Sequence, residues 1–180
     1  YEKEALPGGK MNRIDMDGYQ FDLGPSIVMM PELYREVFEL TGRNPDDYIP
    51  MQKIDPMYST YFGAKAEEKY DISSDLVELM KTLENISEED SKGFLNYLQE
   101  IYQRYLVAKN HFLQRPFRNF TDFYNPNTIR QMLKLKTFDS ADHFIGKYVK
   151  NERFKQILSF QTLYIGVSPY NGPSLYTIIP

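Results

Sequence analysis

Helical spacing of apolar residues begins at Ser74 and continues through most of the remaining chain, and it limits the possible folds more than any other feature. The longest such stretch is marked by Phe94, Leu98, Ile101, Tyr105, Ala108 and Phe112. Steps of four and three positions predict an amphipathic helix. Ser87 and Asp90 predict its start as a capping box, and Pro116 predicts its end because proline cannot donate a helical hydrogen bond.

Two β-hairpins are expected ahead of this helical part. The stretch "NRIDMDGYQFDL" (12–23) has Asp17-Gly18 at its centre, a preferred two-residue turn, so Met16 should face Tyr19 across the pair. The stretches "MYSTYF" (57–62) and "KYDI" (69–72) predict a second, weaker pair. Between the hairpins, Pro31 and Gly42 delimit a short helix.

Further helices are expected at 76–83, 128–136, 140–150 and 152–164, with another beginning at Pro173. The fold class is therefore α+β: a predominantly α-helical block with two small β-hairpins. A chain of 180 residues fits one domain with a real core. Its 15 Tyr, 12 Phe and 8 Met suit either a bulky apolar ligand or a well-filled interior.

Several kinds of chemistry are disfavoured. The absence of cysteine excludes disulfides, cysteine zinc sites and thiol nucleophiles. His111 and His143 show no metal-ligand spacing, so no metal is expected. "GGK" at 8–10 lacks the upstream glycine and the following Ser or Thr of a phosphate loop. The uncharged run 156–180 is interrupted by glycines and prolines, which disfavours a membrane span.

The segment from Arg104 to Lys136 is basic in an acidic chain. It holds seven Lys or Arg and one acid, Asp122, whereas the whole chain has a net charge of -4. Aromatic residues alternate with the bases, and four of these residues are expected to face an anionic membrane surface: Arg115, Phe117, Arg118 and Phe120. A solvated basic face is the competing interpretation. A nucleic-acid surface could look similar, but no nucleic-acid partner is expected from the overall charge.

Five segments carry a family resemblance: "YEKEALPGGKMN", "FDLGPSIVMMP", "DFYN", "LKLKTF" and "FQTLYIGVSPYNGPSLYTIIP". Together, and with similar spacing along the whole chain, they resemble FAD-dependent bacterial carotenoid desaturases, most closely those acting on C30 precursors. The resemblance implies a piece of a Rossmann-type FAD-binding flavoprotein of the amine oxidase/phytoene desaturase type. It also implies that this chain is an internal fragment, inactive and without FAD when isolated.

The resemblance assigns roles to individual residues. Glu2 would bind the adenosine ribose of FAD, Gly8 and Gly9 would let the backbone approach the cofactor, and Lys10 stands where the family commonly has Arg. Cofactor contacts are also implied for Gly24, Pro25 and Ser26. A tunnel for the C30 polyene hydrocarbon substrate would include Ile27, Met29, Met30, Phe160, Tyr164 and Ile165. No catalytic acid or base is identified.

The implied organisation has four parts. Residues 1–30 are a remnant of the FAD-binding domain, and 31–73 are part of the substrate-binding domain. Residues 74–172 form a helical, membrane-facing block, and 173–180 return to the substrate domain. The implied location is the cytoplasm, peripherally on the inner face of the plasma membrane. Two alternatives remain open: a non-catalytic helical module that binds lipid or a protein partner, and an amine-oxidase-type flavoenzyme that shares the Glu2 and Gly8-Gly9 features.

Overall fold

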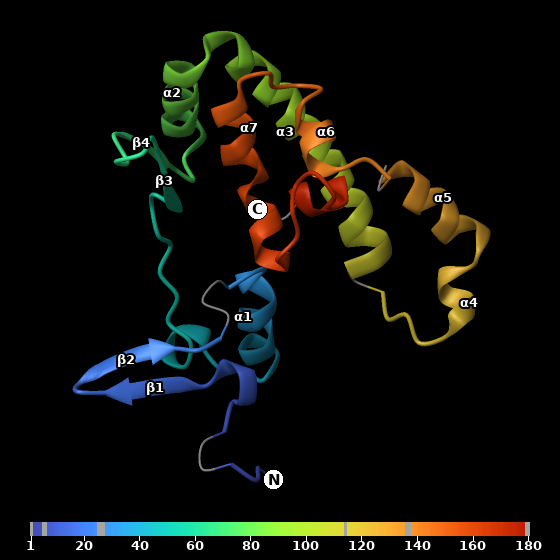
Figure 1. Cartoon of the computed structure of the whole chain (residues 1–180). Helices are drawn as coiled ribbons and strands as arrows, with labels where there is room; N and C mark the ends of the chain where they lie inside the picture. Colours follow the sequence, from blue (N-terminus) through green and yellow to red (C-terminus); the bar gives the residue numbers. More distant parts are fainter. Residues whose placement is uncertain (1, 5–6, 25–27, 114, 136–137, 179–180) are drawn as a thin grey trace. The chain divides into compact units, whose positions relative to one another are not determined.

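The computed structural model describes residues 2–4, 7–24, 28–113, 115–135 and 138–178 (Figure 1). The chain forms two compact units, residues 1–53 and 54–180. The boundary between them falls inside the segment 31–73, which the sequence assigned to the substrate-binding domain. Each unit is described by itself below.

The first unit contains the expected hairpin. Strands β1 (Arg13–Met16) and β2 (Tyr19–Asp22) pair antiparallel, with Met16 opposite Tyr19, so the register predicted from the sequence is confirmed. The turn residues Asp17 and Gly18 have φ values of 52° and 81°, the left-handed backbone that a type I′ turn requires. Short 3₁₀ turns lie at η1 (Gly9–Met11) and η2 (Pro45–Asp47).

Helix α1 (Pro31–Leu40) is also confirmed, with proline in its first turn. Gly42 follows the helix with φ of 73°, and its N–H donates to the Glu39 carbonyl, so it ends the helix as expected. Arg35 on this helix forms a two-pronged ion pair with Asp46 of η2, with N–O distances of 2.6 and 3.1 Å. This pair ties α1 to η2 within the first unit.

The second unit begins with the other hairpin and continues as helices. Strands β3 (Tyr58–Phe62) and β4 (Glu68–Ile72) pair antiparallel. The helices are α2 (Leu76–Ile86), α3 (Glu88–Ala108), α4 (Phe120–Phe123), α5 (Pro126–Lys134), α6 (Ala141–Ile145) and α7 (Glu152–Leu158). A π-helical turn η3 (Lys109–Leu113) extends α3, and 3₁₀ segments lie at η4 (Ser159–Ile165) and η5 (Ser174–Ile178). The α+β class, mainly helical with two hairpins, is therefore confirmed.

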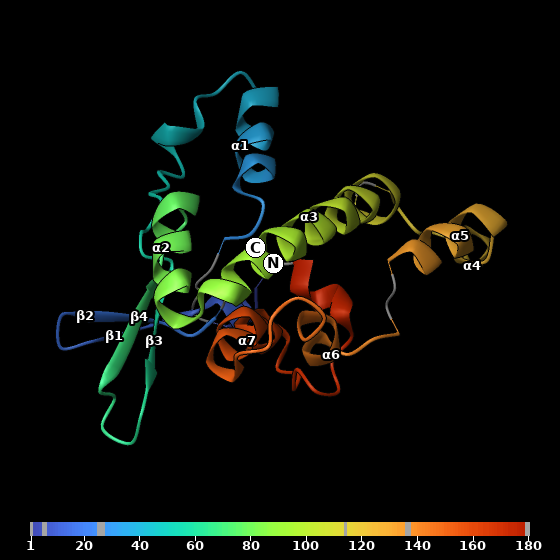
Figure 2. The ribbon, with the colours of Figure 1, turned by 90° about the horizontal axis from the view of Figure 1, so that it is seen from above.

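The core of the second unit lies where α2, α3, α6 and α7 meet (Figures 1 and 2). Its buried members are Leu83, Phe94, Tyr97, Phe144, Ile145, Val149, Phe154 and Leu158. Ring contacts join the helices, with Phe94 5.8 Å from Phe154 and Tyr97 5.6 Å from Phe144, measured between ring centroids. Gly93 lets α3 lie directly against the Tyr148 carbonyl, because a Cβ there would overlap that oxygen.

The start of α3 is held by two side chains, only one of which acts as the sequence predicted. The Ser87 hydroxyl accepts from the Asp90 N–H at 3.2 Å, which is the expected N-cap. The buried Asp90 carboxylate instead accepts from the backbone N–H groups of Lys150 and Asn151, at 2.9 and 2.6 Å. Asp90 therefore joins α3 to the turn that precedes α7.

Arg104 is a correction to the basic segment, because it lies inside the protein. Its side chain is 3% exposed. The guanidinium stacks 3.7 Å from the Phe144 ring centroid, pairs with Glu100 at 3.3 Å and donates to the Ser174 hydroxyl at 3.1 Å. One of the seven bases is thus used for packing rather than for the surface.

Three helix predictions differ from the structure. The helix expected at 140–150 is helical only as α6 and ends at Gly146, and the one expected at 152–164 becomes 3₁₀ after Leu158. In that 3₁₀ segment, the hydroxyls of Ser159 and Thr162 bond back to backbone carbonyls, which competes with regular α-helix. The helix expected from Pro173 is the 3₁₀ segment η5. The short helix α4 was not predicted. None of the helices in the described ranges combines the length and apolar character that crossing a membrane requires.

Candidate functional site

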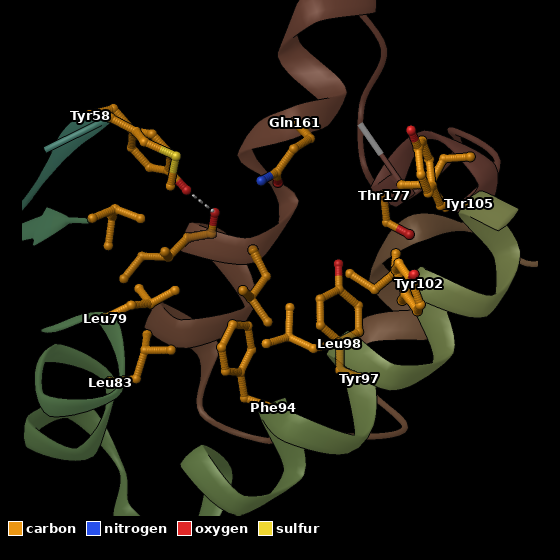
Figure 3. Close-up of a pocket in the computed structure, with 16 residues that line it drawn as sticks. Tyr58, Leu79, Leu83, Phe94, Tyr97, Leu98, Tyr102, Tyr105, Gln161 and Thr177 are labelled. Atoms are coloured by element: carbon orange, nitrogen blue, oxygen red, sulfur yellow. Dashed lines mark hydrogen bonds between the residues drawn. The ribbon is translucent and has the colours of Figure 1, made fainter. Parts of the chain in front are cut away.

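An apolar pocket of about 360 Å³ lies in the second unit (Figure 3). It is lined by Met57, Tyr58, Ile72, Leu79, Leu83, Phe94, Tyr97, Leu98, Ile101, Tyr102, Tyr105, Ile157, Leu158, Gln161, Thr177 and Ile178. These residues come from the second hairpin, from α2, α3 and α7, and from η4 and η5. The volume falls in the range of small-molecule sites.

The pocket follows one face of α3. Figure 3 shows Leu79 and Leu83 at one end, Tyr102 and Tyr105 at the other, and Leu98 between them. Leu83 is fully buried, so the first end is closed by the core, whereas Tyr102 is 59% exposed. The pocket is therefore an elongated channel with a closed end at α2 and an accessible end near the last third of α3.

Few polar groups face this channel. The Tyr97 hydroxyl is hydrogen-bonded to Thr177, whose own hydroxyl donates to the Ser174 carbonyl at 2.7 Å. Burial raises the pKa of the Tyr97 phenol, which favours its neutral form. Within the described residues, the Gln161 Oε1 atom is buried without a hydrogen-bond partner. The described lining contains no carboxylate, lysine, arginine or histidine. Such a wall positions an apolar molecule rather than transferring protons.

The predicted tunnel residues do not line this pocket where they are described. Phe160 is adjacent to it, because its ring stacks on the lining residue Tyr58 at 4.5 Å between centroids. Ile165 is exposed at the end of η4, and Met29 and Met30 lie in the first unit. Ile27 and the side chain of Tyr164 lie outside the described residues. The tunnel roles of these six residues remain predictions.

Of the predicted cofactor residues that are described, Glu2, Gly8, Gly9 and Lys10 are exposed in the first unit and Gly24 is half-buried. Glu2 Oε1 accepts from the backbone N–H groups of Lys3 and Glu4, at 2.7 and 3.0 Å. Gly8 and Gly9 have φ values of 125° and 53°, a backbone that glycine adopts readily, and no heavy atom lies within 4 Å of a Cβ built on Gly9. An exposed carboxylate is suited to a ribose hydroxyl, and accessible glycine backbone is suited to a phosphate, as a dinucleotide would require.

Two of these cofactor segments are in direct contact. A Cβ on Gly24 would overlap the Lys10 carbonyl oxygen and lie 2.9 Å from the Met11 Cα, so only glycine fits there. The Leu23 N–H donates to the Asn12 carbonyl at 2.8 Å, which continues the hairpin beside this contact. The structure thus brings Lys10 and Gly24 together. Pro25 and Ser26 lie outside the described residues.

The basic, aromatic segment around α4 and α5 presents charge and apolar surface together. Arg115 and Arg118 are exposed, and Phe120 is 77% exposed with its ring stacked 4.3 Å from that of Tyr124. Phe117 is half-buried, 4.4 Å from the Phe123 ring centroid. Exposed apolar residues nearby are Leu113, Phe123, Tyr124, Ile129, Met132, Leu133 and Phe138.

Sequence reasoning found only part of the apolar channel. The stripe on α3 that forms one wall was visible as helical spacing, but it predicted only an amphipathic helix and not the wall of a pocket. Tyr97, Gln161 and Thr177 carried no local signal. Only the packing of η4 and η5 against α3 and α6 brings these three side chains to one channel.

Comparison with known proteins identifies the relatives of this chain. No protein-family model matches it. It is 44% identical over all 180 residues to a 4,4'-diapophytoene desaturase (4,4'-diaponeurosporene-forming) of Staphylococcus haemolyticus (strain JCSC1435). It is 43% identical over the same length to proteins of that name from Staphylococcus aureus strains Newman and bovine RF122 / ET3-1. The chain spans 36% of the length of each of these relatives. The resemblance to bacterial carotenoid desaturases is confirmed, and over its whole length this chain is similar to a segment of the 4,4'-diapophytoene desaturases.

Proposed function

We propose that the protein to which this chain belongs is an FAD-dependent desaturase that dehydrogenates 4,4'-diapophytoene, a C30 polyene precursor, in carotenoid biosynthesis. The observation that carries this proposal is the identity of 43–44% with desaturases of that name over an alignment that covers all 180 residues, the helical part included. This extent favours a desaturase over a non-catalytic helical module. It also favours a desaturase over an amine-oxidase-type enzyme, because the relatives' name specifies the polyene precursor.

The first unit supplies part of the cofactor site in this proposal, within a Rossmann-type FAD-binding domain. Glu2 accepts hydrogen bonds from the ribose hydroxyls, and Lys10 places a positive charge near the pyrophosphate. The glycines at 8, 9 and 24 keep the backbone compact and accessible, which the close contact of Gly24 with the Lys10 carbonyl supports. When bound, FAD supplies the hydride acceptor of the dehydrogenation.

The second unit positions the substrate. Its apolar channel along α3 removes hydrocarbon surface from water, which is worth about 25 cal/mol for each Å² buried. A hydrocarbon has no polar group to orient it, so the shape of the wall must do this. The predicted tunnel residue Phe160 lies beside the channel lining, stacked on Tyr58, in the segment that follows α7. Ile165 lies at the end of the same segment.

We extend the proposal to a peripheral membrane location on the cytoplasmic side. Diapophytoene partitions into lipid, so the enzyme must collect it at a bilayer surface. Exposed Phe120 beside Arg118 and Arg115 offers an apolar group to the interface and charge to anionic headgroups. In co-sedimentation, binding to anionic vesicles should exceed binding to neutral vesicles and should fall in a Phe117→Ser, Arg118→Glu double variant. Equal binding to both vesicle types, or an unaffected double variant, contradicts this location.

Expression of the complete protein in cells that accumulate 4,4'-diapophytoene tests the enzymatic proposal. Extraction and mass analysis should reveal a product that has lost pairs of hydrogens and absorbs at longer wavelength. Purified complete protein should contain flavin, and Glu2→Gln should lower its FAD affinity at least tenfold because a hydrogen bond to a charged group is lost. Unchanged diapophytoene, or a purified complete protein without flavin, contradicts the proposal.

A further inference from the structure

The length of the apolar channel can be compared with the length of a carbon chain. Phe94 near its closed end and Tyr105 near its accessible end are eleven residues apart on one helix, which corresponds to about 16 Å at 1.5 Å per residue. A zigzag carbon chain with bonds of ~1.5 Å and angles near 111° advances about 1.25 Å per carbon. The channel is therefore about 13 carbons long.

The pocket volume agrees with a narrow occupant. At about 360 Å³ it lies near the lower end of the range of ligand sites, roughly 300–1,000 Å³. A pocket of this size along α3 suits one extended chain better than a bulky ring system.

We propose that this channel receives one end of the polyene, about 13 carbons, and that Leu83 and Phe94 stop it. Both side chains are buried in the core and do not yield easily to an entering chain. Less than half of a C30 chain fits, so the remainder lies outside the channel. The depth of insertion sets which carbon–carbon bond lies at the reacting centre, which makes the closed end a determinant of specificity. The inference rests on the proposed function for the identity of the chain.

A hydrocarbon fits this channel better than a polypeptide segment does. Every residue of an inserted segment would bring a backbone carbonyl and, except for proline, an N–H that need partners. The described lining offers little to bind them. The Tyr97 hydroxyl is already paired with Thr177, and Gln161 Oε1 is the one buried side-chain acceptor of the described lining without a partner. A chain without polar groups leaves none unsatisfied.

Graded primary alcohols from octanol to hexadecanol test the depth of the channel without requiring turnover. Their displacement of the fluorescent polyene 1,6-diphenylhexatriene is measured on the complete protein to which this chain belongs. The affinity should rise about fourfold for each added methylene until the closed end is reached, and then level off at about 13 carbons.

Two substitutions should shorten the channel in proportion to their positions. Leu98 lies seven residues before Tyr105 and Ile101 lies four, about 10 and 6 Å along the helix. Leu98→Trp should move the levelling point to about 8 carbons, and Ile101→Trp to about 5, where even octanol gains nothing from its length. Both side chains are only partly buried, so a larger residue can be accommodated there. Two variants are used so that the test still stands if one of them does not fold. Leu95→Trp is the matched control, because Leu95 lies on the same helix, is 47% exposed and does not line the pocket.

The outcomes separate this inference from the proposed function. The channel of fixed depth is supported if the chain length at which affinity levels off decreases from wild type to Leu98→Trp to Ile101→Trp and is unchanged in Leu95→Trp. This result holds even if the complete protein desaturates nothing. The inference is overturned if no alcohol displaces the probe, if affinity still rises beyond 16 carbons, or if Leu95→Trp shifts the levelling point as far as Leu98→Trp does.

Discussion

Replacement of Asp90 by asparagine tests the packing of the helices that form the channel. The Asp90 side chain is buried, at 5% exposure, and its two oxygens accept separately from the N–H groups of Lys150 and Asn151. Asparagine keeps the shape, but it has one oxygen and an amide NH₂ that would face a donor. One hydrogen bond to a charged group is lost, which is worth about 1.5–3 kcal/mol. We expect Asp90→Asn to lower the free energy of unfolding by about 2–3 kcal/mol.

Urea denaturation followed by far-ultraviolet circular dichroism measures this change. Glu89→Gln is the control, since it removes the same charge from the same helical turn at an exposed position. That loss should not exceed about 1 kcal/mol, the upper end of the usual helix-dipole effect at an exposed position. If the two variants differ by less than 0.5 kcal/mol, the carboxylate does not hold α3 to the turn before α7.

Three further predictions concern other contacts. Gly93→Ala should destabilise the second unit by about 1–3 kcal/mol in urea denaturation, because the alanine methyl would overlap the Tyr148 carbonyl. Alanine is the better helix former, so a variant that is more stable than the wild type contradicts this contact. Gly24→Ala should accelerate amide hydrogen exchange in residues 7–24 and leave exchange in residues 54–178 unchanged, because the alanine methyl would overlap the Lys10 carbonyl. Equal exchange rates in the variant and the wild type contradict this contact. Burial raises the pKa of the Tyr97 phenol, so above pH 10 only the phenol of the unfolded chain ionises. The contribution of Tyr97 to stability is therefore present below pH 10 and is lost above it by about 1.4 kcal/mol per pH unit. The wild type should lose its stability advantage over Tyr97→Phe between pH 9 and 11, and a difference in stability that does not change with pH contradicts this effect of burial.

Local signals predicted the secondary structure where a single dipeptide or cap determines the backbone. Asp17-Gly18 fixed the register of the first hairpin because both residues must adopt positive φ, and Gly42 ended α1 for the same reason. Helix length after residue 140 was overestimated. Apolar spacing continues there, but the N–H groups of Lys147 and Tyr148 bond three residues back instead of four. After α7, the hydroxyls of Ser159 and Thr162 compete for backbone carbonyls.

The pocket and the buried polar contacts were beyond local reasoning, because their partners are distant in sequence. Asp90 had the signature of a capping box, yet its carboxylate binds backbone sixty residues away. Arg104 had the appearance of a surface base, but Phe144 and Ser174 surround it with a ring and a hydroxyl. Composition and spacing do not specify which helices meet, and these contacts exist only once the helices have packed.

The rate at which the complete protein desaturates 4,4'-diapophytoene, compared between Leu98→Trp and Leu95→Trp, tests the central claim most directly. Both variants add the same bulk to α3, but only Leu98 lines the channel. Chromatography of extracted pigments should show wild-type product from Leu95→Trp and at least a tenfold loss from Leu98→Trp. Wild-type rates and products from both variants would contradict the account, because the channel would then play no part in binding the substrate.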